Sequence, residues 1–372
     1  MKFFSYRSNL AALILVGLPL LMGCVPGPMS SSKLEEAPAY TPSPSSGDMR
    51  ILTINVWSGL SYKGFFKMEE YEHHPEKRYE LLLSEIRKLH PDIIAIQEAN
   101  PLPGYVKRLA ADLDYQVIYC VALGGIRFGS FGIPTNMREG QAILVKKPRT
   151  IQALAKKRLG GQGIATNWFC LQFEETTQAL LGRTVINDKP LYIYNLHLHS
   201  GPFHGSALNA SLERLIQELP KEKVEEAKRG MERDIESRKK EIKKLVKFID
   251  DTLPAGMPAI LMGDFNTTVE SGELDLLIKE GEWVDSFRLK NPHEEGATWD
   301  PLRNPNFRPL GNPSTPYEIL HSYHDRYPCR VDFILSHKNI PEDHILESRI
   351  VLTPKDGFSP SDHYGILTTL KW

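Results

Sequence analysis

The feature that most constrains the fold is a set of eight short apolar segments spread along the chain. Each is seven to eleven residues long, is rich in Ile, Val, Leu and aromatic residues, and ends at polar or turn-forming residues. Segments of this kind predict buried strands, and eight of them require large sheets. They are residues 50–58, 92–99, 141–147, 167–173, 190–200, 258–266, 329–336 and 364–372.

Amphipathic segments lie between the predicted strands. Residues 76–90 and 268–281 have the spacing and the ends of helices, and we expect both to cover a sheet. Residues 206–252 are rich in Lys and Glu and carry an apolar stripe, which predicts a scaffold helix docked on one face; a lipid- or partner-binding arm is the alternative. Residues 286–328 are rich in Pro, Asn, His and Arg and predict an extended loop region of the kind that often lines a cleft.

The first residues have the pattern of an export signal. Lys2 and Arg7 precede an apolar run at residues 10–22 that is too short to span a membrane comfortably, so residues 1–23 are predicted to be a signal peptide. The run ends in Leu-Met-Gly-Cys, which resembles a bacterial lipobox and makes Cys24 the predicted lipidation site. Cleavage by the ordinary signal peptidase and an uncleaved anchor are the alternatives.

The segment that follows is low in large apolar side chains. Residues 24–48 are rich in Pro and Ser and cannot bury enough surface to offset the entropy of ordering, so they predict a tether. Residues 49–372 form the predicted folded domain. We therefore expect an exported protein that is lipid-anchored to a bacterial membrane, either at the outer membrane or at the cell surface.

Charge and cysteine content exclude some classes of protein. The chain has 45 Lys and Arg against 46 Asp and Glu, so no global basic field draws it to nucleic acid. Cys120, Cys170 and Cys329 have no metal-type spacing and are predicted to be buried small hydrophobes. Stability must therefore come from an apolar core.

Polar side chains follow the ends of several predicted strands. Asn55 and Glu98 end the first two, and a carboxylate directly after a buried run must be paired or bind a cation. The other members of this set are His197, His199, Asp264, Asn266, Asp332, Asp362 and His363. Taken singly, an Asn or Asp here is usually a turn former and a His is often a satisfied core residue.

Together these residues suit one kind of chemistry. Carboxylates and an Asn without a thiolate favour a hard cation, Mg²⁺ or Mn²⁺, which keeps coordination positions for water and a substrate phosphate. Histidines beside such an ion supply a group that deprotonates water and a donor for charge on phosphoryl oxygens. The combination predicts phosphoester hydrolysis.

Six short motifs in fixed order carry a family resemblance. They are NVW, PDIIAIQE, NLHLHSG, GDFN, VDFIL and SDH, and the resemblance that they carry extends from about Arg50 to Trp372. This set resembles the endonuclease/exonuclease/phosphatase superfamily, whose members include deoxyribonuclease I and neutral sphingomyelinases. The resemblance implies an α+β fold, a four-layer α/β sandwich in which two mostly antiparallel β-sheets pack face to face with helices on both outer sides.

The resemblance also implies roles for the residues at the strand ends. Asn55, Glu98 and Asp362 are the implied metal ligands. Asp264 aligns or deprotonates the attacking water, and Asn266 and His197 contact phosphoryl oxygens. His363 is the implied general base or phosphate contact, oriented by Asp332. His199 is the alternative to His197, because LHLH resembles the sphingomyelinase form and HSGP the deoxyribonuclease form; we favour His197.

The resemblance leaves the substrate open between two phosphodiesters. The NVW start and a Gly-rich apolar segment at residues 124–134 favour a phospholipid head group, although that segment is also consistent with an ordinary hairpin. Arg127, Arg138, Lys146 and Lys147 are candidates for a nucleic-acid groove, but no dense basic cluster adjoins a motif. An exported nuclease is the alternative, and a non-catalytic binding lipoprotein is the third hypothesis. No obligate protein partner is evident.

Overall fold

A computed structural model describes residues 48–372, apart from residues 59, 63–67, 71–73, 173–175 and 309–311. The predicted signal peptide, Cys24 and the tether up to residue 47 lie outside the described residues. Among the described residues, no helix combines the length and apolar character needed to cross a bilayer.

The first large sheet contains both the first and the last of the described strands. Its six strands run in the order β17-β18-β1-β4-β8-β5. Their bounds are Ile345–Val351 (β17), Gly365–Lys371 (β18), Asp48–Asn55 (β1), Ile93–Ala99 (β4), Glu139–Lys146 (β8) and Tyr115–Leu123 (β5). Only β1 and β4 are parallel to each other; the other neighbours are antiparallel.

The second large sheet repeats this plan. Its six strands run in the order β15-β16-β14-β13-β12-β9, and only β13 and β14 are parallel. Their bounds are Trp283–Asp285 (β15), Asp332–His337 (β16), Ala259–Asp264 (β14), Lys189–His197 (β13), Gln178–Ile186 (β12) and Ile151–Arg158 (β9). Each sheet therefore has a parallel pair at its centre.

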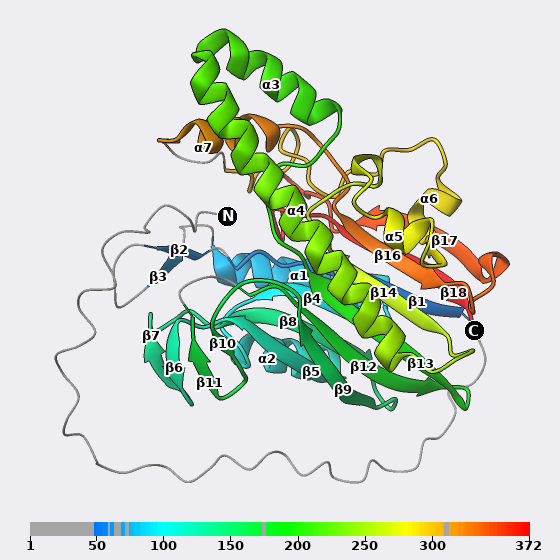
Figure 1. Cartoon of the computed structure of the whole chain (residues 1–372). Coiled ribbons are helices and arrows are strands. Elements are labelled where there is room, and N and C mark those ends of the chain that lie inside the picture. The colour runs from blue at the N-terminus through cyan, green and yellow to red at the C-terminus, as the bar shows by residue number, and fades with distance from the viewer. Residues whose placement is uncertain (1–47, 59, 63–67, 71–73, 173–175, 309–311) are drawn as a thin grey trace.

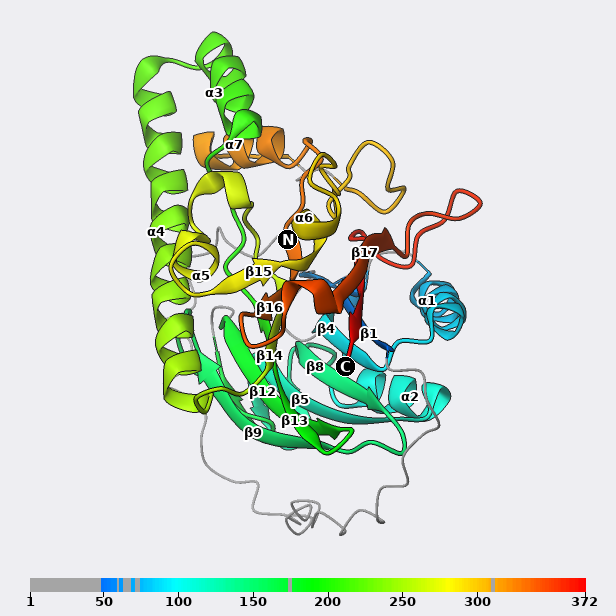
Figure 2. The same cartoon turned by 90° about the vertical axis from the view of Figure 1, so that its right-hand side faces the viewer.

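Helices cover the outer face of each sheet. Figures 1 and 2 show α1 and α2 outside the first sheet and α4 and α5 outside the second. The bounds are Pro75–Leu89 (α1), Gly104–Leu113 (α2), Lys221–Thr252 (α4) and Asp275–Ile278 (α5). The predicted α+β four-layer sandwich, with two mostly antiparallel sheets face to face, is confirmed.

Alternation along the central strands builds three apolar layers. In β4, Ile93 and Ala95 pack between the sheets, whereas Ile94 and Ile96 pack beneath α1 and α2. A strand buried on both faces needs an unbroken apolar run, which is why this segment was visible in the sequence. A third cluster joins the second sheet to α4. The buried residues of these clusters lie between Met49 and Leu370.

Two smaller sheets flank the sandwich. One is a hairpin of β2 (Leu60–Tyr62) and β3 (Met68–Glu70). The other has four strands in the order β10-β11-β6-β7. Their bounds are Ile164–Ala165 (β10), Phe169–Leu171 (β11), Ile126–Phe128 (β6) and Phe131–Ile133 (β7). The Gly-rich segment 124–134 is thus a hairpin.

The helical predictions need three corrections. Residues 206–252 form two helices, α3 (Ser206–Glu218) and α4, because Pro220 has no backbone N–H and the chain is extended there. Residues 268–281 form only a 3-10 turn, η1 (Val269–Ser271), and the one-turn helix α5, since Gly272 has φ 74° and ends the first turn. Residues 286–328 also contain α6 (Ser286–Lys290) and α7 (Pro316–His324). A 3-10 turn, η2 (Glu342–His344), precedes β17.

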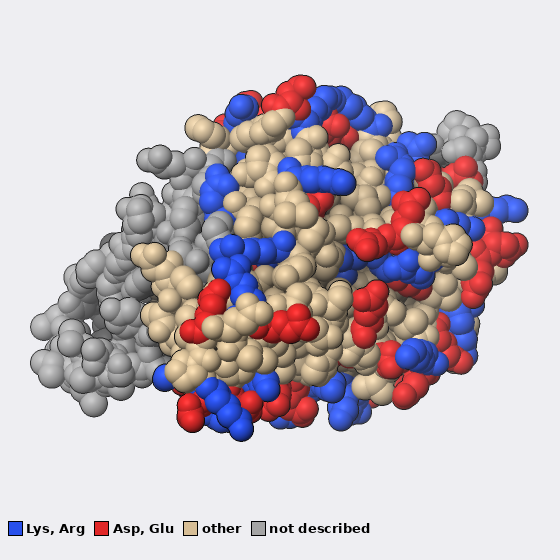
Figure 3. All heavy atoms as spheres, turned by 90° about the horizontal axis from the view of Figure 1, so that it is seen from above, with Lys and Arg blue, Asp and Glu red and all other residues tan. Residues whose placement is uncertain are grey.

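The charged stretch is nonetheless docked as a scaffold. The apolar stripe of α4 is buried; its members are Val224, Met231, Ile235, Ile242, Leu245 and Ile249. The first half of α4 packs with α3 and α7, and the second half packs on the second sheet. Seen from above, acidic and basic side chains are interspersed over the surface, consistent with the balanced composition (Figure 3).

Candidate active site

The two parallel strand pairs place their carboxyl ends at one edge of the sandwich. Asn55 ends β1 and Glu98 lies near the end of β4, while His197 and Asp264 end β13 and β14 and are directly paired in register. Parallel strands bring their carboxyl ends to the same edge of a sheet. Polar residues from distant parts of the chain therefore meet there.

Asn55 joins the two sheets through its carboxamide. Its Nδ2 donates to Glu98 Oε1 at 3.1 Å and to Asp264 Oδ2 at 3.0 Å, and its Oδ1 accepts from the Trp57 N–H at 2.9 Å. The second oxygen of Glu98 accepts from the Ser58 N–H at 3.2 Å. Asn55 is fully buried, and its contacts fix the two carboxylates relative to each other.

The two candidate histidines have different surroundings. His197 is buried, with Nε2 3.6 Å from Asp264 Oδ2 and 3.9 Å from Glu98 Oε1. The His199 ring instead lies 2.9 Å from Asp234 Oδ1 of α4. The structure therefore brings His197, and not His199, to the carboxylates at the strand ends.

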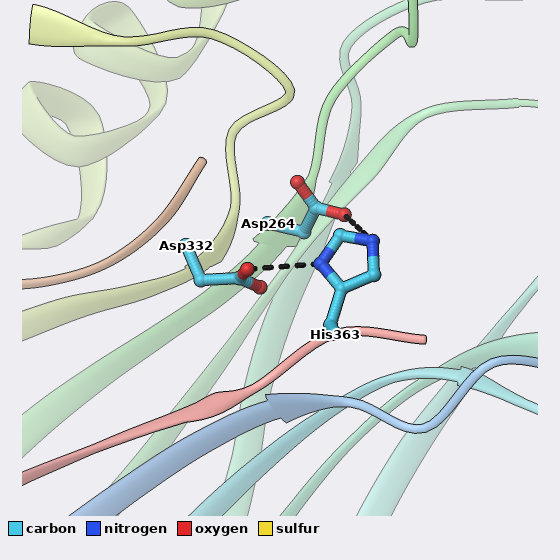
Figure 4. A group of neighbouring side chains, drawn as sticks. All are labelled: Asp264, Asp332 and His363. Carbon is cyan, nitrogen blue, oxygen red and sulfur yellow. Dashed lines mark hydrogen bonds and ion pairs between the residues drawn. The ribbon is translucent and has the colours of Figure 1, made fainter. Parts of the chain in front are cut away.

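His363 lies between two aspartates from the second sheet (Figure 4). Its Nδ1 is 2.9 Å from Asp332 Oδ2, and its Nε2 is 3.9 Å from Asp264 Oδ2. Asp264 and Asp332 are directly opposite each other on β14 and β16. This arrangement orients the imidazole through one nitrogen and leaves the other facing the Asp264 carboxylate.

Burial and close charges shift the pKa values of these groups. Burial alone would lower the pKa of His363, but Asp332 and Asp264 raise it to about 10. Burial raises the pKa of Asp264, and the Asp332 carboxylate raises it further, against the opposing effect of His363 and His197. The positive charge of His363 and His197 therefore does not fully offset the effects of burial and of Asp332 on the pKa of Asp264.

Burial and nearby charges also shift the pKa values of Glu98 and Asp362. Burial opposes ionisation of Glu98, but His197 and the Asn55 hydrogen bond hold its pKa below the usual range. Burial raises the pKa of Asp362 to about 6; His363 opposes this rise and Glu98 adds to it. The Glu98 charge therefore contributes to the raised pKa of Asp362.

Asn266 follows the GDF turn and lines the same edge. It has φ 50°, its backbone N–H donates to Asp264 Oδ1 at 2.9 Å, and its Nδ2 donates to the Leu198 carbonyl at 2.9 Å. All the residues predicted for the site except His199 are thereby placed around one group of buried oxygens.

The loop region contributes contacts that the sequence did not reveal. The Trp299 ring packs against His363 with centroids 5.2 Å apart, and Asn304 Nδ2 donates to the carbonyls of Ser361 and Asp362 at 3.0 and 2.8 Å. The Thr298 hydroxyl accepts from the Asp332 N–H at 3.2 Å. Only the prediction that residues 286–328 line a cleft pointed to this region.

A buried amide pair behind the site also escaped notice. Gln97 Nε2 donates to Asn195 Oδ1 at 2.7 Å, and Asn195 Nδ2 donates to the Ile96 and Ala142 carbonyls at 3.0 and 2.8 Å. These bonds tie one sheet to the other next to the strands that carry Glu98 and His197. Gln97 lies in the PDIIAIQE motif and Asn195 in the NLHLHSG motif. An amide side chain within an apolar run was the sequence signal that could have identified them.

The donor set fits a divalent cation. Ligand-type atoms of Asp264, Asp332 and His363 lie within 4.8 Å of one another in a buried group. Asp332 Oδ1 is buried with no hydrogen-bond partner among the described residues. Hard cations favour such convergent carboxylate oxygens. Glu98 of β4 and Asp362 in the segment before β18 add carboxylate oxygens, and Asn55 of β1 donates to Glu98 and Asp264.

Comparison with solved structures identifies the fold. A D. rerio TDP2 humanised by 14 mutations is 17% identical, with a TM-score of 0.54 over 88% of this chain and 100% of that one. An endonuclease/exonuclease/phosphatase family protein from Bacteroides thetaiotaomicron is 14% identical, with a TM-score of 0.54 over 89% and 96%. Caenorhabditis elegans TDP2 is 14% identical, with a TM-score of 0.55 over 87% and 74%. At these identities the likeness concerns the fold.

Comparison of the sequence with protein families shows to which family the chain belongs. No curated protein matches the chain. Residues 52–363 match the Endonuclease/Exonuclease/phosphatase family, a span that starts within β1 and ends at His363. The span includes every residue that the structure gathers at the strand ends, and the chain therefore belongs to this family.

Proposed function

We propose that this protein is a phosphodiesterase that depends on Mg²⁺ or Mn²⁺ and hydrolyses its substrate with water. The observation that carries the proposal is His363, which lies 2.9 Å from Asp332 and 3.9 Å from Asp264 beside the Asn55–Glu98 pair. A histidine oriented by one carboxylate and facing another suits proton transfer at a charged phosphoryl group.

Asn55, Glu98 and Asp362 are the proposed ligands of the cation. When bound, the cation polarises a phosphoryl oxygen and makes a coordinated water more acidic. Glu98 suits this role because its low pKa keeps it ionised in a buried place. The raised pKa of Asp362 indicates a carboxylate that gains from a nearby positive charge.

The second sheet supplies the proposed groups for water and phosphate. Asp264 aligns the attacking water. His363, which a pKa of about 10 keeps protonated at neutral pH, contacts a phosphoryl oxygen as a donor at Nε2 while Asp332 holds Nδ1. His197 contacts the phosphoryl oxygens. Asn266 uses one amide hydrogen to bond Leu198, which leaves its second amide hydrogen for a phosphoryl oxygen.

The substrate that we favour is a phospholipid head group, as in sphingomyelinases. The NVW motif and the exposed apolar side chains of the β6–β7 hairpin support a lipid-linked substrate. A nuclease is the second candidate, because a structure of D. rerio TDP2 is described as complexed with a single-strand DNA product. Arg127, one of the cations considered for a nucleic-acid groove, is buried beneath that hairpin, which weakens the second candidate.

Export and lipid anchoring through Cys24 complete the proposal. The support is the sequence of residues 1–48, which combines a signal-like start, a lipobox-like end and a tether. Labelled palmitate fed to cells that express the full chain should enter the wild type and be absent from Cys24→Ser. Equal labelling of the two proteins would remove the lipid anchor from the proposal.

The catalytic proposal is tested with residues 48–372 and three substrates. Hydrolysis of bis(p-nitrophenyl) phosphate, sphingomyelin vesicles and plasmid DNA is measured with Mg²⁺, with Mn²⁺ and after chelation. We expect chelation to abolish turnover and His363→Ala to lower it by roughly 10²–10⁴-fold. Release of phosphocholine supports the lipid substrate, whereas nicking of DNA alone supports the nuclease.

His197→Ala and His199→Ala form a matched pair for this experiment. The two residues are only two positions apart at the end of β13, yet only His197 lies near the carboxylates of the site. We expect a large loss of turnover for His197→Ala and a small change for His199→Ala. The reverse result would contradict our assignment, and no turnover of any substrate by a metal-loaded wild type would favour a binding lipoprotein.

A further inference from the structure

The small sheet β10-β11-β6-β7 has two unlike faces. Ile126 pairs with Leu171 and with Ile133, and Phe128 pairs with Phe169 and with Phe131. Side chains that are directly paired across strands lie on the same face of a sheet. These apolar residues therefore share one face, and the alternate residues, among them Arg127, share the other.

The apolar residues of this sheet point to the outside. Their exposed fractions are far above those of core residues, and Trp168 next to β11 joins them. We name the following six residues the apolar face: Ile126 (40%), Phe128 (54%), Phe131 (76%), Ile164 (50%), Trp168 (56%) and Leu171 (38%). Phe128 and Trp168 are in ring contact, with centroids 4.2 Å apart. Six large apolar side chains gathered on one small sheet form a patch of the kind that marks an interaction surface.

The opposite face packs inward and carries the buried residues Arg127 and Cys170. Arg127 is only 5% exposed, and its guanidinium donates to the carbonyls of Ser130, Pro134 and Met137 at 3.1, 3.2 and 3.0 Å. The guanidinium thus provides hydrogen-bond donors for carbonyl groups in and after the hairpin, on its buried side. With Arg127 on the buried side, the apolar side chains of the hairpin lie on the exposed side.

Basic side chains border the apolar face. Lys156 Nζ donates to the Ala165 carbonyl at 3.2 Å, Arg158 bonds the Gly163 carbonyl, and Arg138 bonds the Asn167 carbonyl. We call these three residues the basic rim. The surroundings of the apolar face therefore favour an anionic partner.

The apolar face lies at the same end of the sandwich as the candidate active site. The β6–β7 hairpin connects the end of β5 to the start of β8, and the start of β8 pairs with the end of β4, next to Glu98. Asp48, where the described chain begins, is at the other end of β1. Figure 1 shows the small sheet well away from α3 and α7.

We infer that the apolar face docks onto a lipid bilayer whose surface is anionic. Phe and Trp side chains enter the interface between head groups and acyl chains, and Lys and Arg around them attract anionic head groups. Three of the six residues are aliphatic and offer nothing for a base to stack on, which argues against nucleic acid. A symmetric contact with a second copy would bring two basic rims together. The inference extends the proposed lipid substrate but needs no catalysis.

Vesicle binding tests this inference. Residues 48–372 carrying His363→Ala, so that no lipid is consumed, are sedimented with vesicles of phosphatidylcholine, with or without phosphatidylglycerol. We expect binding that is stronger with phosphatidylglycerol and weaker at high salt. Phe131→Ser should weaken binding by about tenfold or more. Acyl chains carrying bromine should quench the fluorescence of Trp168, and Trp168→Phe should remove that quenching.

Matched controls keep the test specific. Ile216→Ser removes an equally prominent apolar side chain, 58% exposed on α3, and should leave binding unchanged. In the protein that retains His363, Phe131→Ser should still hydrolyse bis(p-nitrophenyl) phosphate as the wild type does, which separates docking from catalysis. The inference would be overturned if the protein bound neither kind of vesicle, or if Phe131→Ser bound vesicles as well as the unsubstituted protein does. It would also be overturned if Phe131→Ser kept vesicle binding but lost binding to an oligonucleotide or lost the ability to form a dimer.

Discussion

At the scale of single residues, Glu98 has a backbone conformation that non-glycine residues seldom adopt. Its φ is 55°, and the carboxylate that results is held by the Asn55 carboxamide and the Ser58 N–H. Such conformations persist only when the surroundings determine them strongly, and they cluster at functional sites. Asn266, on the other sheet, is another residue of the site with positive φ. The left-handed backbone at both strand ends turns polar groups toward the same space.

His199 gives a residue-scale prediction about pH. Burial would lower its pKa, but the hydrogen bond and charge of Asp234 raise it above the usual value. A histidine whose folded pKa is raised adds stability that is fully present below its unfolded pKa of about 6.5 and is lost as pH rises through the folded value. His199→Gln should therefore destabilise the protein at pH 5.5–6 by about 0.5–1 kcal/mol, and less at pH 9.

Urea unfolding across this pH range measures the effect. His204→Gln, which changes an exposed histidine in the following loop, serves as the control and should show little difference from the wild type. A deficit of His199→Gln that grows with rising pH would contradict the prediction, because it would mean that neutral His199 is the more stabilising form.

At the scale of elements, α4 is fastened to the sandwich by a buried ion pair. Arg238 Nε donates to Glu273 Oε2 at 2.8 Å, and both side chains are fully buried. The same guanidinium donates to the carbonyls of Gly201 and Pro202 at 3.1 and 2.7 Å. One arginine thus joins α4, the segment after β13 and the turn before α5.

Removal of one partner of this pair should be costly. Glu273→Gln leaves the Arg238 charge buried without its counter-charge, and we expect a loss of about 3–5 kcal/mol in the free energy of unfolding. Asp251→Asn breaks an exposed pair on the same helix, 3.1 Å from Lys247, and should cost less than about 0.5 kcal/mol. Denaturant unfolding of both variants gives the comparison, and equal small losses would show that the buried pair does not fasten α4.

The elements also show where prediction from the sequence works. β4 and β14 were recognisable because both of their faces are buried, so their apolar runs are continuous. β9 was not, because it is an edge strand whose side chains are mostly exposed and include Lys156 and Lys157. An edge strand needs few apolar side chains, so its pattern resembles that of a loop.

The same reasoning applies to the site. Residues such as Glu98 and Asp264 were found because a carboxylate at the end of an apolar run conflicts with burial. Trp299 and Asn304 were not, because they lie in a loop region where aromatic and amide residues are unremarkable. Their contacts with His363 and Asp362 depend on how the loop crosses the sandwich, which no local pattern encodes.

At the scale of the whole molecule, the crowded carboxylates couple metal binding to stability. If the cation binds the folded protein alone, a concentration about 100 times its Kd should stabilise the fold by roughly 2.7 kcal/mol. We therefore expect Mg²⁺ to raise the Tm and a chelator to reverse the rise.

Two variants show whether the site is responsible. Glu98→Gln should abolish the rise in Tm, whereas Glu270→Gln, an exposed residue of η1, should retain it. Differential scanning calorimetry with and without Mg²⁺ measures both. A rise that persists in Glu98→Gln would place the cation elsewhere.

The sheet that contains β1 also contains β18, and the two are directly paired along six residues from Asp48 to Thr53. The pairing of β1 with β18 therefore cannot form until β18 has been synthesised. His363 precedes β18 by two residues, and the Asn55 carbonyl accepts from the Ser361 hydroxyl at 2.6 Å, so the site closes only when the carboxyl-terminal segment has emerged. A chain truncated before Ser361 would lack both this contact and His363. Assembly of the site therefore depends on segments from opposite ends of the described domain, although about 300 residues separate them in the sequence.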